Sequence, residues 1–493
     1  MKSENDADYD QFLSWLIRNS YYISPSIKIT ENSIAGRGII SLHTIFPPEL
    51  LVSFSKAIVL SPKNSLFSPL LSKQCSDTGT PRQKILHEYP AQSDPLAIVR
   101  LTLAFLLEKS LNHKSFWAPY FDALDEASTP DSILLWGRDQ MRLKGTNVYE
   151  AARNVLQIYY EQYKEIVIPF FENSKSLPRS CPSWPEYLRA CTLTQSRCFY
   201  IDDYHQLALV PFCDIFNHQT NPEIAFLQCS NSTVGLSSNR EPADSTICNF
   251  TLNSLVEQGE EIFNCFGSFC ADELLIQYGF LDPTCEIWQV DLEKTVRNLF
   301  KETFRSWKQY FDLDSPSHSY NENDKHALDG SSNHSHNILA RHQKSLCIFS
   351  NLGPSVAIFS FACFLIYSSH VNRYPSTSNQ LPFLEFEKRL WNLHVGIVQT
   401  RKPLDEQEFM NLYSRVLKTL DYIYETRKNR YENGCLSATD YKFLLENSAF
   451  EHKSRAFITV KVFYHELLLL ESEHQRCIEL QSIIQNRLGD YKS

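Results

Sequence analysis

The sequence has no hydrophobic run long enough to cross a membrane. Its longest apolar run extends from Val356 to Tyr367, whereas a membrane-spanning helix needs about 20 apolar residues. The N-terminal stretch MKSENDADYD is polar and acidic, so it lacks the apolar region of a secretory signal. We therefore expect no membrane partner and a location in the cytoplasm or the nucleus.

The sequence also lacks paired cysteines and an excess of positive charge. Its 14 cysteines include no C-x-x-C pair and no cluster spaced like zinc ligands, which favours a reducing compartment and argues against a metal site. The 57 Asp and Glu outnumber the 47 Lys and Arg, for a net charge of -10, which speaks against nucleic-acid binding. A basic protein fits this chain better as a partner, and we expect a monomer.

The chain is long enough for several structural units, because 493 residues exceed the roughly 100 to 200 residues of one domain. No internal repeat is present. In some segments apolar residues alternate with polar ones, which is typical of strands. In other segments apolar residues recur at helical spacing. Predicted strands cover 27–41, 51–60, 207–212 and 262–266. Predicted helices cover 12–17, 96–109, 151–171, 296–311, 356–367, 405–428 and 456–470.

This order predicts an α+β chain with two domains. A β-rich domain is expected over residues 20–290, with a helical insertion at about 95–185. An all-α domain is expected over residues 291–493. The stretch from 314 to 337 is rich in Ser, Asn and His and is predicted to be an exposed loop, because its irregularly spaced histidines do not form a metal-binding pattern.

Three separated segments carry the functional signal. The first is Ala35-Gly36-Arg37-Gly38, where glycine leaves bare backbone that a ligand can approach. The second contains Asp214-Ile215-Phe216-Asn217-His218, which alone is as typical of a polar loop as of a binding site. The third runs from Gly259 through Phe266-Gly267 to Gln277-Tyr278-Gly279-Phe280, a strand and turn followed by a helix that ends at glycine.

Together these segments resemble a SET domain. The most similar subgroup contains the Rubisco large-subunit methyltransferase, the ribosomal-protein lysine methyltransferases of fungi and the actin histidine methyltransferase. Its helical insertion resembles this chain around Phe116-Trp117-Ala118-Pro119-Tyr120, and its helical C-terminal substrate-binding domain resembles it around residues 455–471. The resemblance covers most of the chain, and it implies an enzyme that moves a methyl group from S-adenosylmethionine to a lysine of another protein.

The resemblance also implies a role for each matched residue. Arg197 would hold the cofactor carboxylate, a task suited to the planar guanidinium. Asn217 would contact the cofactor through its amide and His218 largely through its backbone, with Asp214 at the start of the same stretch. The backbone of Ala35, Gly36 and Arg37 would line the cofactor. Phe266 and Tyr278 would form the aromatic wall of the channel that admits the substrate amine.

One position departs from the family pattern. Most SET domains have Tyr where this chain has Phe266, so the ring is kept and the hydroxyl is lost. We expect catalysis to persist, with Tyr278 and backbone carbonyls aligning the amine. Two alternatives stay open from the sequence. The acceptor could be histidine rather than lysine, or the chain could be an inactive binding module. A ribosomal protein is the first candidate for the substrate.

Overall fold

The computed structural model describes most of the chain as two compact units. Unit 1 comprises Met1–Arg138, Ala151–Phe269 and Glu273–Cys285, and unit 2 comprises Asp139–Glu150, Cys270–Asp272 and Glu286–Ser493. The described residues are 4–33, 36–74, 96–124, 128–174, 176–220, 224–229, 246–267, 269–282, 284–285, 287–311, 345–350, 353–371, 383, 386–390, 407–431, 435–451 and 454–490. The polar loop predicted at 314–337 lies outside them, as does Ala35.

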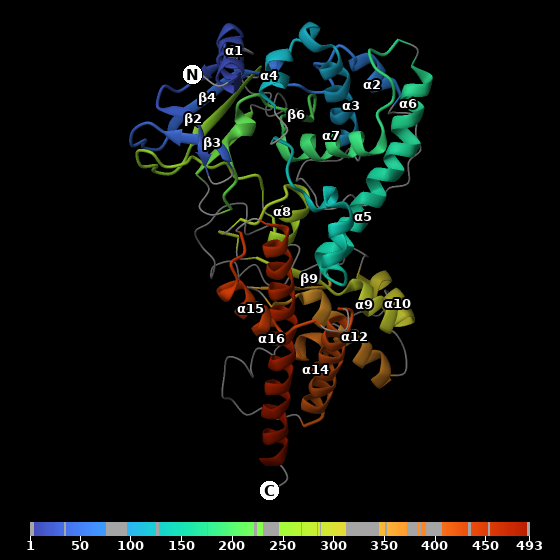
Figure 1. Ribbon diagram of the computed structural model, residues 1–493. Coiled ribbons are helices and arrows are strands. Elements are labelled where there is room, and N and C mark those ends of the chain that lie inside the picture. Colours follow the sequence, from blue (N-terminus) through green and yellow to red (C-terminus); the bar gives the residue numbers. More distant parts are fainter. Residues whose placement is uncertain are drawn as a thin grey trace, which may run out of the picture. The chain divides into compact units, whose positions relative to one another are not determined.

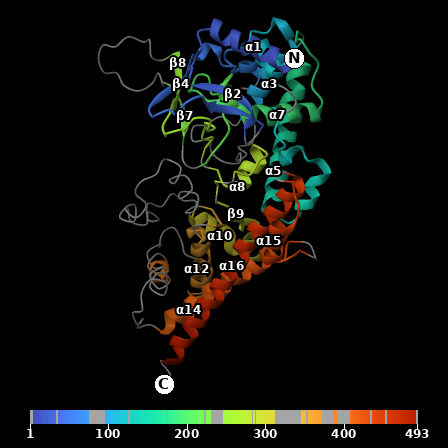
Figure 2. The same cartoon turned by 60° about the vertical axis from the view of Figure 1, so that its left-hand side comes forward.

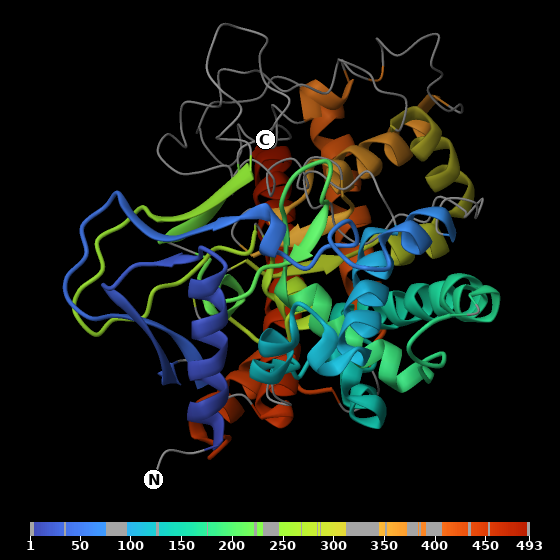
Figure 3. The same ribbon diagram turned by 90° about the horizontal axis from the view of Figure 1, so that it is seen from above.

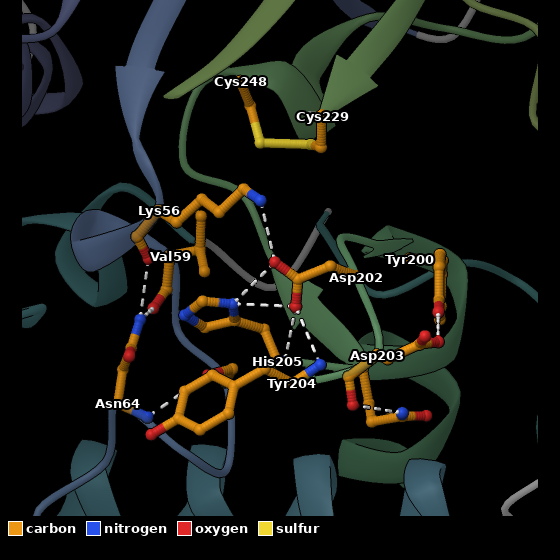
Figure 4. Close-up of polar contacts among 12 residues, drawn as sticks. Lys56, Val59, Asn64, Tyr200, Asp202, Asp203, Tyr204, His205, Cys229 and Cys248 are labelled. Carbon is orange, nitrogen blue, oxygen red and sulfur yellow. Dashed lines mark hydrogen bonds and ion pairs between the residues drawn. A yellow bond between two sulfur atoms is a disulfide. The ribbon is translucent and has the colours of Figure 1, made fainter. Parts of the chain in front are cut away.

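The largest sheet of unit 1 has four antiparallel strands in the order β1-β4-β8-β7. The strands are β1 Tyr22–Ile23, β4 Glu49–Ser55, β8 Ile247–Leu252 and β7 Ala225–Cys229 (Figure 1). Val52 pairs with Phe250 in register, and both side chains are fully buried, so one face of this sheet forms core. A disulfide joins the register partners Cys229 and Cys248 (Figure 4), and nothing in the sequence indicated this pairing.

The described part of unit 1 also contains two β-hairpins. Strands β2 Ile27–Ser33 and β3 Gly36–Ser41 form the first, and β5 Cys198–Tyr200 and β6 Leu207–Leu209 form the second. The strand predicted over 27–41 is thus two strands, and the glycine pair at 36 and 38 lies at the start of β3. Segment 262–266 was predicted as a strand, but the stretch makes isolated bridges at Glu261 and Asn264, because its backbone bonds to β3 through Ile262 and to the Asn217 segment through Asn264.

Helices fill the stretch between β4 and β5. They are α2 Ser68–Gln74, α3 Ala97–Ser110, α4 Ala118–Ala123, α5 Asn147–Gln162, α6 Ile168–Asn173 and α7 Trp184–Arg197, and α1 Glu4–Arg18 precedes β1. Helix α3, which was predicted over 96–109, is confirmed and is almost wholly buried because its residues are apolar on every face. Figure 3 shows α5, α6 and α7 on one side of unit 1 and the β2–β3 hairpin on the other, whereas β6 lies against α3.

Two predictions for this region are wrong. Residues after Pro185 were expected to form small sheets, but α7 runs to Arg197, since Tyr187, Cys191 and Thr194 bury one face of a helix. Its Thr194 hydroxyl lies 2.9 Å from that of Thr102 on α3. The strand predicted over 51–60 ends at Ser55, whose side chain accepts a hydrogen bond from the Ala57 N–H and starts a short 3-10 helix, η1 Lys56–Ile58.

Unit 2 is mainly helical, as predicted. Its helices include α9 Glu293–Leu299, α10 Lys301–Phe311, α12 Val356–Val371, α14 Gln407–Lys428, α15 Ala438–Asn447 and α16 Arg455–Asp490. Helices α14 and α16 pack side by side (Figure 2). A small sheet, ordered β11-β10-β9, accompanies them and was not predicted. Its strands are β9 Gln289–Asp291, β10 Cys347–Phe349 and β11 Gly353–Pro354.

The apolar helix α12 is a core helix. Most of its side chains are buried, which fits a helix that is hydrophobic on all sides. Across the described parts of both units, no helix combines the length and apolar character needed to cross a bilayer.

Candidate active site

Asn217 joins three parts of unit 1 that are far apart in the sequence. Its amide nitrogen Nδ2 lies 2.8 Å from the carbonyl oxygen of Arg37, 3.0 Å from Ser33 Oγ and 2.6 Å from Glu261 Oε1. An amide has two N–H groups, so these protein oxygens fully occupy the nitrogen. Its carbonyl oxygen Oδ1 has no hydrogen-bond partner among the described residues and is therefore the atom of Asn217 left for a ligand.

The backbone around Glu261 fixes this junction. On one side the Ile262 N–H donates to the Ile39 carbonyl at 2.8 Å, and on the other the Asn264 N–H donates to the Asn217 carbonyl at 2.8 Å. Segment 261–264 therefore lies between strand β3 and the Asn217 segment. The first and second sequence motifs are held together by the third.

The two glycines of β3 have different reasons to be glycine. Gly36 has a φ of +94°, and a Cβ placed there would meet nothing within 4 Å, so its backbone faces open space. A Cβ on Gly38 would come within 2.8 Å of Asn217 Nδ2 and 2.7 Å of Ser33 Cβ. Gly38 thus permits the close approach of β3 to Asn217, and Gly36 leaves backbone accessible to a ligand.

Arg197 lies at the C-terminal end of α7 and contacts Asp214. Its Nη1 donates to the Asp214 carbonyl at 3.0 Å and lies 3.4 Å from Oδ2 of the same residue, while Nε and Nη2 donate to the Ser128 carbonyl at 3.0 and 2.9 Å. Nη2 keeps a second N–H beyond these contacts. The Tyr120 hydroxyl donates to Asp214 Oδ2 at 2.7 Å.

Asp214 is a buried carboxylate with an unused acceptor. Burial raises its pKa above the ordinary value, although the charge of Arg197 and the hydrogen bond from Tyr120 oppose this. Its Oδ1 is buried and has no hydrogen-bond partner among the residues that the structure describes, which is costly unless something fills that role. The preceding turn is also strained, because the buried Phe212 has a φ of +76°, a conformation that side chains rarely adopt outside functional sites.

The imidazole of His218 is fully buried and supports Phe266. The Phe266 N–H donates to Nδ1 of His218 at 3.0 Å. The other ring nitrogen, Nε2, lies 3.0 Å from the Thr220 hydroxyl and 3.7 Å from Asp282 Oδ2. The structure therefore gives the side chain of His218 a role that the sequence analysis, which expected mainly backbone contact, did not assign.

Aromatic rings surround Phe266 and Tyr278, the two residues for which the sequence analysis expects a channel wall. The Phe266 ring centroid lies 4.9 Å from that of His218 and 5.0 Å from that of Tyr278. Phe269 and Phe280 lie 5.5 and 6.2 Å from Tyr278. The sulfonium of a methyl donor and the ammonium of a product are tolerated by such rings.

Tyr278 is positioned by the turn that ends helix α8, Ala271–Gln277. Gly279 has a φ of +79°, and a Cβ there would lie 2.6 Å from the backbone nitrogen of Ser132, so only glycine fits. The Ser132 hydroxyl donates to the Ile276 carbonyl at 2.6 Å. This contact fixes the turn from outside the three sequence motifs.

The described residues predicted for the site thus lie in one connected region of unit 1. Sequence reasoning missed Glu261, Tyr120, Thr220 and Asp282, which support that region. Glu261 stood inside the third sequence motif, directly before the strand predicted at 262–266, but nothing in the sequence paired it with Asn217. No described group of three or more His, Cys, Asp or Glu is arranged to hold a metal ion.

These groups fit a ligand that carries both a carboxylate and an amino group. The remaining N–H of Arg197 Nη2 suits a carboxylate, and the Asp214 side chain, which is 1% exposed, holds Arg197 from behind. The Oδ1 of Asn217 is an acceptor for an ammonium, and the open backbone at Gly36 offers a further polar contact. S-adenosylmethionine has an amino-acid end of this kind.

Comparison with known proteins gives the family. No family model matches the chain. It is 31% identical over 480 residues to an uncharacterized protein of Schizosaccharomyces pombe, C16C6.01c, covering 97% of this chain and 98% of that protein. It is 24% identical over 298 residues to the N-lysine methyltransferase setd6 of Xenopus laevis, a match that spans 57% of this chain and 58% of that protein.

Solved structures show the same fold. The SET-domain protein LSMT, solved with lysine and AdoHcy, superposes with a TM-score of 0.62 at 14% identity, over 98% of this chain and 94% of that one. Rubisco LSMT bound to AdoMet gives a TM-score of 0.61 at 13% identity, over 97% and 93%. The predicted α+β fold, with a SET domain and a helical C-terminal part, is confirmed. The chain belongs to the SET-domain lysine methyltransferase family, in the subgroup that resembles the Rubisco large-subunit methyltransferase.

Proposed function

We propose that the chain transfers a methyl group from S-adenosylmethionine to the side-chain amine of a lysine in a basic protein, with ribosomal proteins as the first candidates. The enzyme class and the cofactor follow from membership in the family, whose solved members were captured with AdoMet, AdoHcy and lysine. The predictions of a protein-lysine N-methyltransferase and of S-adenosylmethionine are thereby confirmed. The acceptor protein is our proposal.

The observation that carries the proposal is the junction at Asn217. A single amide nitrogen contacts Ser33, Arg37 and Glu261. Backbone hydrogen bonds continue the same junction through residue 264. The open backbone of Gly36, the Asp214 carboxylate and the Arg197 guanidinium are thus held in one region. Methyl transfer requires this because the methyl donor and the amine must be aligned.

Each group has a task in the reaction. When bound, S-adenosylmethionine supplies an electrophilic methyl group on a sulfonium. Arg197 and Asp214 would hold the amino-acid end, and Asn217 and the backbone at 36–37 would hold the rest. The rings of Phe266 and Tyr278 exclude water from the amine and favour its uncharged form, because burial lowers the pKa of a lysine.

The residue at position 266 determines which groups are left to orient the amine. Because it carries no hydroxyl, we propose that Tyr278 and backbone carbonyls align the amine. The aromatic ring at 266 keeps its place through the 3.0 Å hydrogen bond from its own N–H to His218. The missing hydroxyl would then affect how many methyl groups are added rather than whether transfer occurs.

A basic protein as substrate is supported by charge. The chain has a net charge of -10, and an acidic enzyme associates faster with a basic partner. Ribosomal proteins are basic and abundant, and fungal members of the subgroup methylate them. A monomer that acts in the cytoplasm or the nucleus would meet them during synthesis or assembly.

The test is methyl transfer into an extract that lacks this protein. Purified chain and radiolabelled S-adenosylmethionine are added, labelled bands are identified by mass spectrometry, and acid hydrolysis identifies the modified residue. Methyl-lysine on one or a few basic proteins supports the proposal, whereas methyl-histidine would make it a histidine methyltransferase. Tight cofactor binding with no labelled protein would contradict transfer and favour a binding module.

A further inference from the structure

Asp282 is a buried carboxylate behind the aromatic wall. It lies after the Tyr278-Gly279-Phe280 turn, and its side chain is 3% exposed. Its Oδ2 accepts the Thr220 backbone N–H at 2.7 Å, and its Oδ1 accepts the Thr284 N–H at 2.8 Å. The Asp282 carboxylate is therefore fixed by two backbone donors.

The carboxylate is also held in its charged form. Burial alone would raise the pKa of Asp282, but hydrogen bonds from Thr220 and Thr284 outweigh burial and lower this pKa below its ordinary value. A fixed negative charge thus lies 3.7 Å from Nε2 of His218. Such a charge favours a hydrogen on the ring nitrogen that faces it.

The opposite nitrogen of His218 must carry no hydrogen. Nδ1 accepts the N–H of Phe266 at 3.0 Å, and a nitrogen that accepts cannot also be protonated. The neutral imidazole therefore carries its hydrogen on Nε2, which points to the Thr220 hydroxyl at 3.0 Å. Thr220 in turn interacts with Asp282 through its side chain as well as its backbone.

We infer that Asp282 is a positioning residue for methyl transfer, acting through Thr220 and His218 on Phe266. The charge of Asp282 and the hydroxyl of Thr220 select the His218 tautomer that accepts the Phe266 N–H. This hydrogen bond fixes the backbone at residue 266 and, with it, the ring that lies 5.0 Å from Tyr278. The inference rests on the proposed function. Methyl transfer requires the substrate channel, and Asp282 is inferred to act on the wall of that channel.

The chain offers a matched control in Asp202. This buried aspartate of unit 1 also accepts two backbone N–H groups, from Tyr204 at 3.0 Å and His205 at 2.7 Å. It pairs with Lys56 at 2.8 Å and with the His205 ring (Figure 4). Asp202 thus resembles Asp282 in burial and bonding but does not contact His218, Phe266 or Tyr278.

The first readout is structural and needs no turnover. The protein is labelled with ¹⁵N-phenylalanine, and the Phe266 amide signal is assigned as the one missing from Phe266→Tyr. We expect Asp282→Asn and Thr220→Val to move this signal upfield, because its hydrogen bond weakens, whereas Thr220→Ser and Asp202→Asn leave it in place. An unchanged Phe266 signal in folded Asp282→Asn and Thr220→Val would overturn the inference.

The second readout is kinetic. We expect Asp282→Asn and Thr220→Val to lower kcat by about 10- to 100-fold, as small misplacements of reacting groups do, with little change in cofactor affinity. Thr220→Ser should restore the rate, and Asp202→Asn should not lower it. A shifted amide signal with a normal kcat would reduce Asp282 to a structural role and overturn the inference. If the unaltered chain transfers no methyl group, the proposed function fails, and the amide signal still decides whether Asp282 holds Phe266.

Discussion

The amide nitrogen of Asn217 lies 2.6 Å from Oε1 of Glu261, and this contact links the second sequence motif to the third beside the β2–β3 hairpin. Residues 44 positions apart thus meet at one point, with Arg37 as a further partner at 2.8 Å. Because the same hairpin offers its open backbone at Gly36, the stability of this junction should determine how well the cofactor site is formed.

Glu261→Ala should loosen the hairpin. Removing the carboxylate takes away the shortest of the three contacts of the Asn217 amide nitrogen and its one charged acceptor, and a hydrogen bond to a charged group contributes about 1.5 to 3 kcal/mol. We expect faster hydrogen exchange of the amides at 36–41, measured by mass spectrometry. The control is Glu31→Ala, since Glu31 forms an exposed ion pair with Arg37 on the same hairpin and such pairs contribute about 0.2 to 1 kcal/mol. Equal exchange in both variants would contradict the anchoring role of Glu261.

Gly38→Ala should weaken cofactor binding. The new Cβ would lie 2.7 Å from Ser33 Cβ and 2.8 Å from Asn217 Nδ2, so the hairpin must move away from Asn217. Isothermal titration with S-adenosylmethionine should show lower affinity. Gly489→Ala is the control, because a Cβ at that position of α16 meets nothing within 4 Å, and it should leave affinity unchanged. Normal binding by Gly38→Ala would mean that the close approach is not needed.

Phe266→Tyr should raise the rate of methyl transfer or change the number of methyl groups added. It places a hydroxyl where most SET domains have one, beside Tyr278 at a centroid distance of 5.0 Å. Intact-mass analysis of the product over time measures both effects. Phe280→Tyr, at the edge of the same aromatic cluster, is the control. If Phe266→Tyr behaves like the unaltered chain, residue 266 does not face the channel.

Much of the helical structure could be predicted, because helical spacing is a local signal. Helix α14 Gln407–Lys428 agrees closely with its predicted range of 405–428. Helix α16 extends to Asp490, well beyond the predicted end at 470, because its polar C-terminal half has a weaker apolar pattern. The single helix expected at 296–311 is two helices that meet at Phe300.

Candidate site residues that lie within the sequence motifs could be named from the sequence. Residues that join the site through contacts between distant segments could not. Arg197, Asn217 and Tyr278 were named through the family resemblance, and their roles in the site stay predictions. Asp282 was not, because its role depends on the fold bringing Thr220 against it, 62 positions away. The side-chain role of His218 depends in the same way on Phe266, 48 positions away.

Glu466→Ala should strongly destabilise unit 2. Its buried carboxylate accepts the Asn147 N–H at 2.7 Å and lies 3.3 Å from Arg427 Nη2. Both charged side chains are 1% exposed, so removing one leaves an unpaired buried charge, at a cost of about 3 to 5 kcal/mol. Urea unfolding measures the loss. Glu446→Ala, which breaks an exposed pair with Lys442, should cost about 0.5 kcal/mol or less, and a similar loss in both would contradict the prediction.

Glu387→Gln should remove part of the pH dependence of stability. Burial raises the pKa of Glu387 from 4.5 to about 7, so the folded chain prefers the neutral form. The contribution of Glu387 to stability is thus fully present below pH 4.5 and is lost as pH rises to about 7, by at most about 3 kcal/mol. Urea unfolding at pH 5 and pH 8 should show a smaller difference in Glu387→Gln than in the unaltered chain. The same difference in both would mean that Glu387 does not titrate in this range.

The most direct test of the proposed site is the binding of S-adenosylmethionine to the unaltered chain, Arg197→Ala and Asn217→Ala, measured by isothermal titration on folded protein. We predict one cofactor per chain and lower affinity in both variants, because Arg197 would hold the carboxylate and Asn217 both contacts the ligand and anchors β3. Unchanged affinity in both variants would contradict the site described here.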